Sequence, residues 1–142
     1  MSGPADSALD ARGLPRGYPF KPEHEITPRD ASAGGRGGSL LIVDVRTAEE
    51  VAVARVEGAL HIPLHELESR FTEIEDAMDA APDRGLAFLC HHGVRSMKAA
   101  LFARHRGIES AMSIAGGIDL WSLAADPGVP RYERDAGGCR RI

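Results

Sequence analysis

The residues best suited to chemistry lie in one short segment, residues 88–96, which reads FLCHHGVRS. There the thiol of Cys90 follows an apolar run and precedes a polar loop that contains a glycine. Such a thiol can be a buried structural group, a metal ligand or a nucleophile. A cysteine that only packs in a core does not need a polar loop between its strand and the next helix. We therefore favour the nucleophile.

The loop after Cys90 is expected to stabilise negative charge on the sulfur. Its backbone curls from His91 into a helix that begins at Arg95 or Ser96. Successive N–H groups in such a turn form an anion-binding nest at the positive end of the helix. Gly93 permits the tight turn that directs these N–H groups at the sulfur. The Arg95 guanidinium and any protonated histidine would also favour the thiolate over the thiol.

The sequence around this loop is locally basic. Residues 84–108 contain no Asp or Glu, although the whole chain has a net charge of −4. A positive segment suits a small anionic substrate, which would otherwise be repelled by a thiolate. The basic residues of the segment are Arg84, Arg95, Lys98, Arg104 and Arg106.

A metal site is the weakest of the three interpretations. The adjacent side chains of His91 and His92 rarely converge with a neighbouring Cys90 on one ion, and no second pair of ligands is evident. His61 and His65 have the i, i+4 spacing of ligands on a helix, but a proline lies between them and breaks such a helix. We expect no metal and no cofactor.

The second cysteine, Cys139, lies in a C-terminal segment that also contains glycines. Two cysteines do not make a disulfide framework in a chain of 142 residues, which favours a reducing compartment, the cytoplasm. We expect Cys139 to be an exposed thiol. A role as resolving partner of Cys90 stays open.

The composition, 43% hydrophobic over 142 residues, is that of one globular domain. The net charge gives no general attraction to nucleic acid or to anionic lipid. The longest aliphatic run, residues 40–43, is too short to cross a bilayer, and the first twenty residues lack the apolar stretch of a signal peptide. We expect flexible tails over residues 1–22 and 133–142 and a domain over residues 23–132.

Strands alternate with helices along the predicted domain, which indicates an α/β sandwich with a mostly parallel sheet. Buried strands are expected where the sequence is continuously apolar, and helices where apolar residues recur at helical spacing or a capping residue begins the segment. The predicted strands are residues 40–45, 61–63, 86–90 and 111–115. The first predicted helix is short: Thr27 caps its start, and a glycine run at residues 34–38 ends it. The other predicted helices are residues 48–54, the amphipathic segment 64–80, a helix from Arg95 or Ser96 to Gly107, and residues 118–124.

Several landmarks occur together and in a recognisable order. They are Asp44-Val45-Arg46 followed by Glu49 and Glu50, Gly58-Ala59 with Ile62-Pro63, the loop from Cys90 to Ser96, Gly116-Gly117-Ile118 with Trp121, and residues 126–132, DPGVPRY. With these landmarks the chain resembles the rhodanese, or sulfurtransferase, family, and specifically its single-domain members, from about residue 25 to residue 132. The resemblance implies a three-layer sandwich with a mostly parallel central sheet between helices. The last segment is also similar to rhodanese modules at the ends of adenylating enzymes that activate sulfur-carrier proteins.

The resemblance also implies a mechanism. Cys90 would attack the outer sulfur of thiosulfate or a similar small anionic donor, release sulfite and keep a persulfide, which a thiophilic acceptor such as cyanide, a thiol or a sulfur carrier would then take. Arg95 would help to neutralise the donor. Asp44 and Arg46 would brace the loop, or else are ordinary solvated charges. The loop residues expected to hold the persulfide are His91, His92, Gly93, Val94, Arg95 and Ser96.

One position departs from the family pattern. The family commonly has a Gly/Ala-His-Ile-x-Gly-Ala segment, and residues 54–59 here read ARVEGA, so that Arg55 replaces the histidine. We expect this change to alter local packing or the charge on the substrate side without abolishing activity.

Two other functions remain open. Phosphatases and arsenate reductases built on the rhodanese fold place an arginine six residues after the cysteine, whereas Arg95 is five residues after Cys90. The shorter loop forms a smaller nest, which suits one sulfur atom better than a tetrahedral phosphate or arsenate. A non-catalytic or relay rhodanese module is the other alternative, although modules of that kind typically lack the cysteine.

Overall fold

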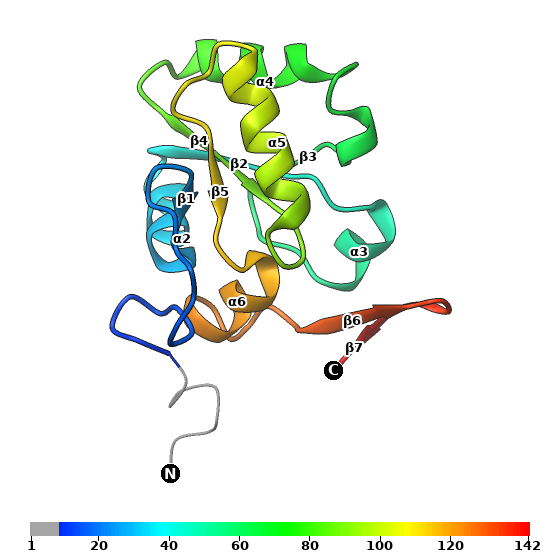
Figure 1. Cartoon of the computed structure of the whole chain (residues 1–142). Helices are drawn as coiled ribbons and strands as arrows, with labels where there is room; N and C mark the ends of the chain where they lie inside the picture. Colours follow the sequence, from blue (N-terminus) through cyan, green and yellow to red (C-terminus); the bar gives the residue numbers. More distant parts are fainter. Residues whose placement is uncertain (1–8) are drawn as a thin grey trace.

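The computed structural model describes residues 9–142, and the sheet and helices alternate along them as shown in Figure 1. The strands are β1 (Glu25–Ile26), β2 (Leu40–Asp44), β3 (Leu60–His61), β4 (Gly85–Leu89), β5 (Met112–Ile114), β6 (Tyr132–Asp135) and β7 (Gly138–Arg141). The helices are α2 (Pro28–Gly37), α3 (Ala48–Val53), the 3₁₀ helix η1 (Leu64–Glu66), α4 (Phe71–Ala80), α5 (Val94–His105) and α6 (Gly117–Ala124).

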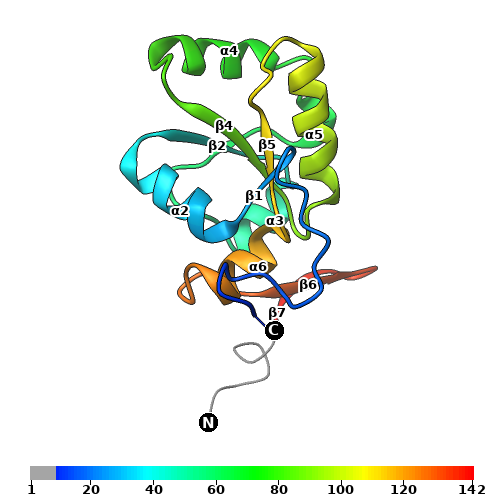
Figure 2. The same ribbon diagram turned by 60° about the vertical axis from the view of Figure 1, so that its left-hand side comes forward.

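The central sheet has five strands in the order β1-β5-β4-β2-β3, and every neighbouring pair is parallel. Helices α4 and α5 cover one face, and α2 and α6 cover the other. Figure 2 shows α2 and α5 on opposite sides of the strands. The predicted α/β sandwich with a parallel sheet between helices is therefore confirmed.

Strand β2 shows how the sheet divides the core in two. Leu41 and Val43 pack with α4 and α5, whereas Ile42, between them, packs with α2 and α6. Successive side chains of a strand point to opposite faces, so a strand covered on both faces must be apolar throughout. Each fully buried aliphatic side chain contributes about 1.5–3 kcal/mol to folding. The continuous apolar run at 40–45 predicted this arrangement correctly.

Helix α2 is longer than the sequence indicates. Thr27 caps it as expected, its side chain accepting a hydrogen bond from the Asp30 N–H, but the helix continues through the glycines at 34 and 35 to Gly37. A Cβ added to Gly35 would lie 2.9 Å from Cδ1 of Ile42, so a glycine here lets the helix approach β2 closely. The helix therefore continues further into the glycine run than its first residue, but the run at 34–38 does end it, as predicted, with Gly38 as the left-handed C-cap.

The prediction of a single helix over residues 64–80 is wrong. The chain forms η1 over Leu64–Glu66, turns, and begins α4 only at Phe71. Within the turn the Ser69 hydroxyl donates to the Glu66 carbonyl, a local hydrogen bond that competes with helix continuation. Leu67 and Phe71 are both buried in the core despite this break. The apolar spacing therefore predicted the burial correctly and the backbone incorrectly.

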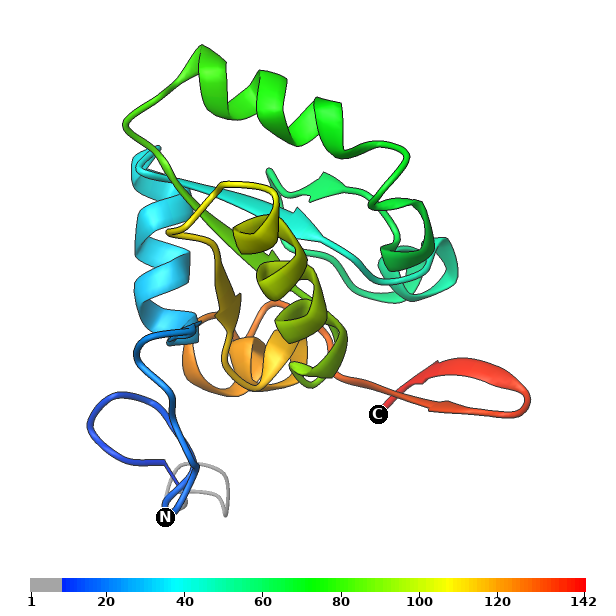
Figure 3. The same ribbon diagram turned by 45° about the horizontal axis from the view of Figure 1, so that its top comes forward.

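Structure is also present in the regions predicted as tails. Residues 1–8 lie outside the described part, but in residues 9–22 Leu14 is fully buried against Ala115 and Leu120. At the other end, β6 and β7 form an antiparallel hairpin that extends away from the sheet near α6 (Figure 3). Tyr132, at its base, is fully buried. Within residues 9–142 no helix is long and apolar enough to cross a membrane.

Candidate active site

Cys90 follows β4 directly, at the carboxyl end of the parallel sheet where ligands of such folds gather. Only 1% of the residue is exposed, so solvent is nearly excluded from the thiol. The Gly93 N–H donates a hydrogen bond to Sγ over 3.0 Å, and Sγ lies 3.3 Å from Oγ of Ser96. Among the loop amides, the one at Gly93 makes this bond in the described structure, so the sulfur is held by one N–H and one hydroxyl instead of a full ring.

A second serine lies behind the first. Oγ of Ser96 is 2.8 Å from Oγ of Ser113 on β5, and both residues are fully buried. Either hydroxyl can donate, so Ser113 can donate to Ser96 while Ser96 donates to an ionised Cys90. Sequence reasoning included Ser96 but missed Ser113. Its only signal was a polar residue inside the apolar strand predicted at 111–115.

The shape of the loop is fixed by the first turn of α6. The N–H groups of Ile118 and Asp119 donate to the carbonyls of Cys90 and His91 over 2.8 and 3.2 Å. A Cβ at Gly117 would collide with both of these carbonyls, so the close approach requires glycine. Gly93 itself has a φ of 111°, in the left-handed region that favours glycine.

The guanidinium of Arg95 is paired with the buried carboxylate of Glu50. Its guanidinium donates to both oxygens of Glu50 over 2.7 and 2.9 Å, and the Tyr132 hydroxyl donates to the same carboxylate over 2.7 Å. Burial alone would raise the pKa of Glu50, but the hydrogen bonds from Arg95 and Tyr132 outweigh it and lower the pKa to about 2. Arg95 therefore lies beside the Cys90 loop as predicted, but its guanidinium forms an ion pair with Glu50 of the same chain.

Asp44 and Arg46 form a buried ion pair with two-pronged geometry, the shortest of its bonds being 2.7 Å. The Arg46 guanidinium also donates to the Tyr132 hydroxyl and to the carbonyls of Glu50 and Ala54. The alternative that Asp44 and Arg46 are solvated charges is therefore wrong. Their bonds brace α3 and the base of the hairpin, and they reach the Cys90 loop through Glu50.

The two histidines have different surroundings. His91 is buried, stacks on Tyr132 with ring centres 4.1 Å apart, and has its Nε2 3.0 Å from the Tyr132 carbonyl oxygen. Burial and the neighbouring His92 lower the pKa of His91, so it is neutral at pH 7 and adds no positive charge to the loop. His92 is exposed, and Val94 beside it is 68% exposed at the rim of the loop.

A tyrosine from the N-terminal segment also reaches this end of the sheet. The Tyr18 hydroxyl donates to the buried carboxylate of Glu25 over 2.7 Å, and its ring packs against the cluster that contains Ala115. Burial and the hydrogen bond to Glu25 raise the pKa of Tyr18. Sequence reasoning missed Tyr18 because it assigned the segment to a flexible tail.

The remaining sequence candidates lie away from the sulfur. Arg55 is exposed and forms an ion pair with Glu57 over 3.3 Å. Cys139 is in β7 and is partly buried instead of exposed; burial and the nearby Glu49 raise its pKa. Both cysteines are free. In the described part of the chain no group of three or more His, Cys, Asp or Glu side chains could hold a metal ion.

This fold and a cysteine loop at the carboxyl end of its sheet agree with the sequence comparisons. The model of the rhodanese-like domain matches residues 27–124. The chain therefore belongs to the rhodanese-like domain family.

Relatives of two sizes share this domain. The thiosulfate sulfurtransferase GlpE of Actinobacillus succinogenes is 30% identical over 108 residues, which are 76% of this chain and 92% of that protein. The adenylyltransferase and sulfurtransferase MOCS3-1 of Zea mays is 33% identical over 93 residues, which are 65% of this chain. The match covers only 20% of the length of the maize protein.

Solved structures give the same architecture. The human single-domain sulfurtransferase TSTD1 superposes with a TM-score of 0.58 at 30% identity, covering 68% of this chain and 93% of that one. The reduced CoADR-RHD of Bacillus anthracis has a TM-score of 0.64 at 22% identity, covering 75% of this chain and 18% of that one; it supports the fold alone.

Proposed function

We propose that this protein is a sulfurtransferase that moves a sulfane sulfur from thiosulfate or a similar anionic donor to a thiophilic acceptor through a persulfide on Cys90. The observation that carries the proposal is the thiol of Cys90 at the end of β4, with the Gly93 N–H 3.0 Å from its sulfur. Family membership and the similarity to GlpE and TSTD1, both named as sulfurtransferases, support it.

In the first step the Cys90 thiolate attacks the outer sulfur of thiosulfate. A new S–S bond forms, the S–S bond of thiosulfate breaks, and its electron pair leaves with sulfite. The negative charge then resides on the outer sulfur of the persulfide. The Gly93 N–H and the Ser96 hydroxyl stabilise the thiolate before the attack, since both lie within hydrogen-bond distance of Sγ.

In the second step an acceptor thiolate or cyanide attacks the outer sulfur of the persulfide. The Cys90 thiolate is the leaving group, and the groups that stabilise it at the start also stabilise it here. The same N–H and hydroxyl therefore lower the barrier of both steps. A thiol or a sulfur carrier is the acceptor we propose for the cell, and the name of the maize relative, adenylyltransferase and sulfurtransferase, supports this class.

The donor is doubly charged, so the site must tolerate an anion. Arg95 is paired with Glu50, and we propose that it contributes to donor binding through its partly exposed edge while it remains in that pair. Loop amides not used by the sulfur supply the rest. The basic segment 84–108 contributes less than its sequence suggests, because Arg84 and Arg104 donate to carbonyls near the amino ends of the strands, away from Cys90. A reactive thiol also requires a reducing compartment, and the cytoplasm is the one we propose.

The test is a mass measurement on the intact protein after treatment with thiosulfate. We expect a gain of one sulfur atom that cyanide reverses with release of thiocyanate, and no gain in Cys90→Ser. A wild-type protein that stays unmodified while it turns over thiosulfate would remove the persulfide from the mechanism. Hydrolysis of a phosphate ester by the same preparation would instead support the phosphatase alternative.

A further inference from the structure

Helix α5 presents an exposed face that begins at the Cys90 loop. Three large hydrophobic side chains are exposed among residues 9–142, and two of them lie on this helix: Val94 at 68% and Leu101 at 46%. Lys98 and His105 of the same helix are also exposed. Spacings of four, seven and eleven residues place all four side chains on one side of the helix. The α5 row is the name used below for Val94, Lys98, Leu101 and His105.

The α5 row leads away from the reactive sulfur. It starts four residues after Cys90, which is only 1% exposed, so an acceptor must reach the sulfur at the loop. In Figure 1 α5 lies in front of the sheet, with no other element over its outer side. The eleven steps from Val94 to His105 measure about 16 Å, which an extended chain of about five residues spans. A protein segment that lies along the row therefore has one end at the Cys90 loop.

Helix α5 is basic as well as partly apolar on its exposed side. It contains Arg95, Lys98 and Arg104 and neither Asp nor Glu. Glu50 neutralises Arg95, but Lys98 forms no ion pair with a described carboxylate. Arg104, at the far end of the helix, donates to two carbonyl oxygens and a methionine sulfur, which leave its charge uncompensated. Charge of one sign on an exposed face favours a partner of the opposite sign.

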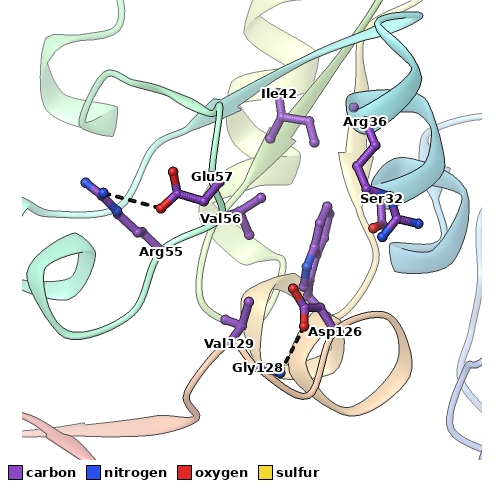
Figure 4. Close-up of a pocket in the computed structure, with 11 residues that line it drawn as sticks. Ser32, Arg36, Ile42, Arg55, Val56, Glu57, Asp126, Gly128 and Val129 are labelled. Atoms are coloured by element: carbon purple, nitrogen blue, oxygen red, sulfur yellow. Dashed lines mark hydrogen bonds and ion pairs between the residues drawn. The ribbon is translucent and has the colours of Figure 1, made fainter.

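A pocket of about 340 Å³ on the opposite face of the sheet lacks this bias of charge (Figure 4). Its wall includes Ile42 and Trp121, which pack in the core under α2 and α6. Its charged residues balance, since they are two arginines and two acids: Arg36, Arg55, Glu57 and Asp126. Charge therefore selects no partner at this pocket, whereas on α5 it favours an acidic one.

We propose that the α5 row docks the sulfur acceptor, and that this acceptor is a protein whose thiol is followed by apolar and acidic side chains. The inference rests on the proposed function, because it names the acceptor of the Cys90 persulfide. The acceptor thiol loses its proton to solvent, and its sulfur attacks the outer sulfur of the persulfide. The S–S bond to Cys90 breaks, Cys90 leaves as the thiolate, and the transferred sulfur carries the negative charge of the new persulfide. The apolar side chains lie on Val94 and Leu101, and a carboxylate pairs with Lys98.

The probes are two synthetic peptides, acetyl-Cys-Leu-Glu-Leu-Glu-amide and acetyl-Cys-Leu-Lys-Leu-Lys-amide, which differ in the sign of their charge. The whole protein is first loaded with thiosulfate, and its persulfide is confirmed by mass before a peptide is added. A failure of the proposed function appears at that stage and is distinct from a failure of docking. The transfer rate to each peptide is divided by the rate at which the same peptide reduces dithiodipyridine, which corrects for the acidity of its thiol.

We expect the acidic peptide to accept sulfur about tenfold faster than the basic one at low ionic strength. The preference should decrease when the ionic strength rises from about 0.01 M to about 0.15 M, because the screening length falls from about 30 Å to about 8 Å. Equal corrected rates for the two peptides, or a faster rate for the basic one, would overturn the proposal.

Variants separate the charge of the row from its apolar contact, with each rate taken relative to the rate of the same variant with cyanide. Lys98→Glu should reverse the preference between the peptides. Leu101→Ser should slow both peptides about threefold and leave their ratio unchanged, because both carry the same leucines. The matched control is Arg36→Glu, an equal change of charge at an exposed position of α2, which should leave the preference unchanged. A preference that survives Lys98→Glu, or that Arg36→Glu alters equally, would refute the docking surface.

Discussion

Two groups of polar residues near the Cys90 loop differ in charge: one is ionic and the other is neutral. On one side lies an ionic network in which Asp44, Arg46, Glu50, Arg95 and Tyr132 satisfy one another. On the other side lie the Gly93 N–H and the Ser96 hydroxyl, which contact the sulfur, and the Ser113 hydroxyl, which is bonded to Ser96.

This difference separates support from reactivity. The charged side chains of the network are paired with one another inside the protein. Removal of one of these side chains therefore leaves its partner's charge buried without compensation and destabilises the fold. The neutral groups on the other side are small, and the Gly93 N–H and the Ser96 hydroxyl contact the sulfur directly, so their loss changes the thiolate. The comparison predicts that stability and activity respond to different residues.

The largest effect should come from the sulfur itself. Cys90→Ser should abolish thiocyanate formation from thiosulfate and cyanide, since an alcohol does not replace the thiolate as nucleophile. Its thermal unfolding should remain close to that of the wild type, because the hydroxyl can keep the contacts with Gly93 and Ser96. Turnover in a properly folded Cys90→Ser protein would exclude Cys90 from the reaction.

The next effect tests the ionic side. Because the pKa of Glu50 in the folded protein is about 2 and its ordinary value is 4.5, the stability that this carboxylate contributes is present above pH 4.5 and is lost as the pH falls toward 2. The shift corresponds to about 3 kcal/mol. Glu50→Gln should unfold at a lower urea concentration at pH 7 and should lack this acid dependence. The matched control is Glu73→Gln in an exposed pair, where little should change.

A smaller effect on activity should come from the hydroxyl side. Ser96→Ala removes the hydroxyl 3.3 Å from Sγ and should lower kcat about tenfold, a loss that fits one hydrogen bond to a charged group. Ser113→Ala should lower it by about threefold, because Ser113 acts through Ser96. The rate of Cys90 alkylation by iodoacetamide as a function of pH measures the same effect without turnover.

A matched buried serine serves as the control for these two variants. Ser122 donates to the Val129 carbonyl in the other half of the core. Ser122→Ala should therefore reduce stability while the alkylation rate of Cys90 stays that of the wild type. If Ser96→Ala behaved like Ser122→Ala, the hydroxyl would be structural only.

The smallest effect is expected at His91. Since burial lowers its pKa and keeps the ring neutral, His91→Phe should preserve stacking on Tyr132 and change kcat by no more than about twofold. Loss of the bond to the Tyr132 carbonyl should cost about 1 kcal/mol in denaturant unfolding. A decrease in kcat much larger than that would show that His91 supplies charge to the loop.

The same comparison explains how much could be predicted from the sequence. Apart from Ser113, the reactive side is local: strand, cysteine, glycine turn and helix follow one another within residues 85–105, and their residue types predict both backbone and chemistry. The cap at Thr27 is local in the same way and was predicted correctly.

The ionic side is not local. Glu50 was noted only as one of two acids that follow Arg46 in the sequence, although its carboxylate binds Arg95, 45 residues later, and Tyr132, 82 residues later. Tyr18 and Ser113 depend on the strand order, which places β5 between β1 and β4. No spacing within one segment carries that information. The glycine run at 34–38 ends α2 as predicted, but the close contact of Gly35 with Ile42 on β2, which lets the helix continue to Gly37, is likewise not visible in one segment.

The most direct test follows a labelled atom. Thiosulfate labelled in its outer sulfur is mixed with a slight excess of protein, and the protein is digested after one turnover. The account predicts that the label is on the peptide that contains Cys90 and passes to thiocyanate when cyanide is added. Label that reaches thiocyanate without ever residing on Cys90, or that resides on Cys139, would contradict it.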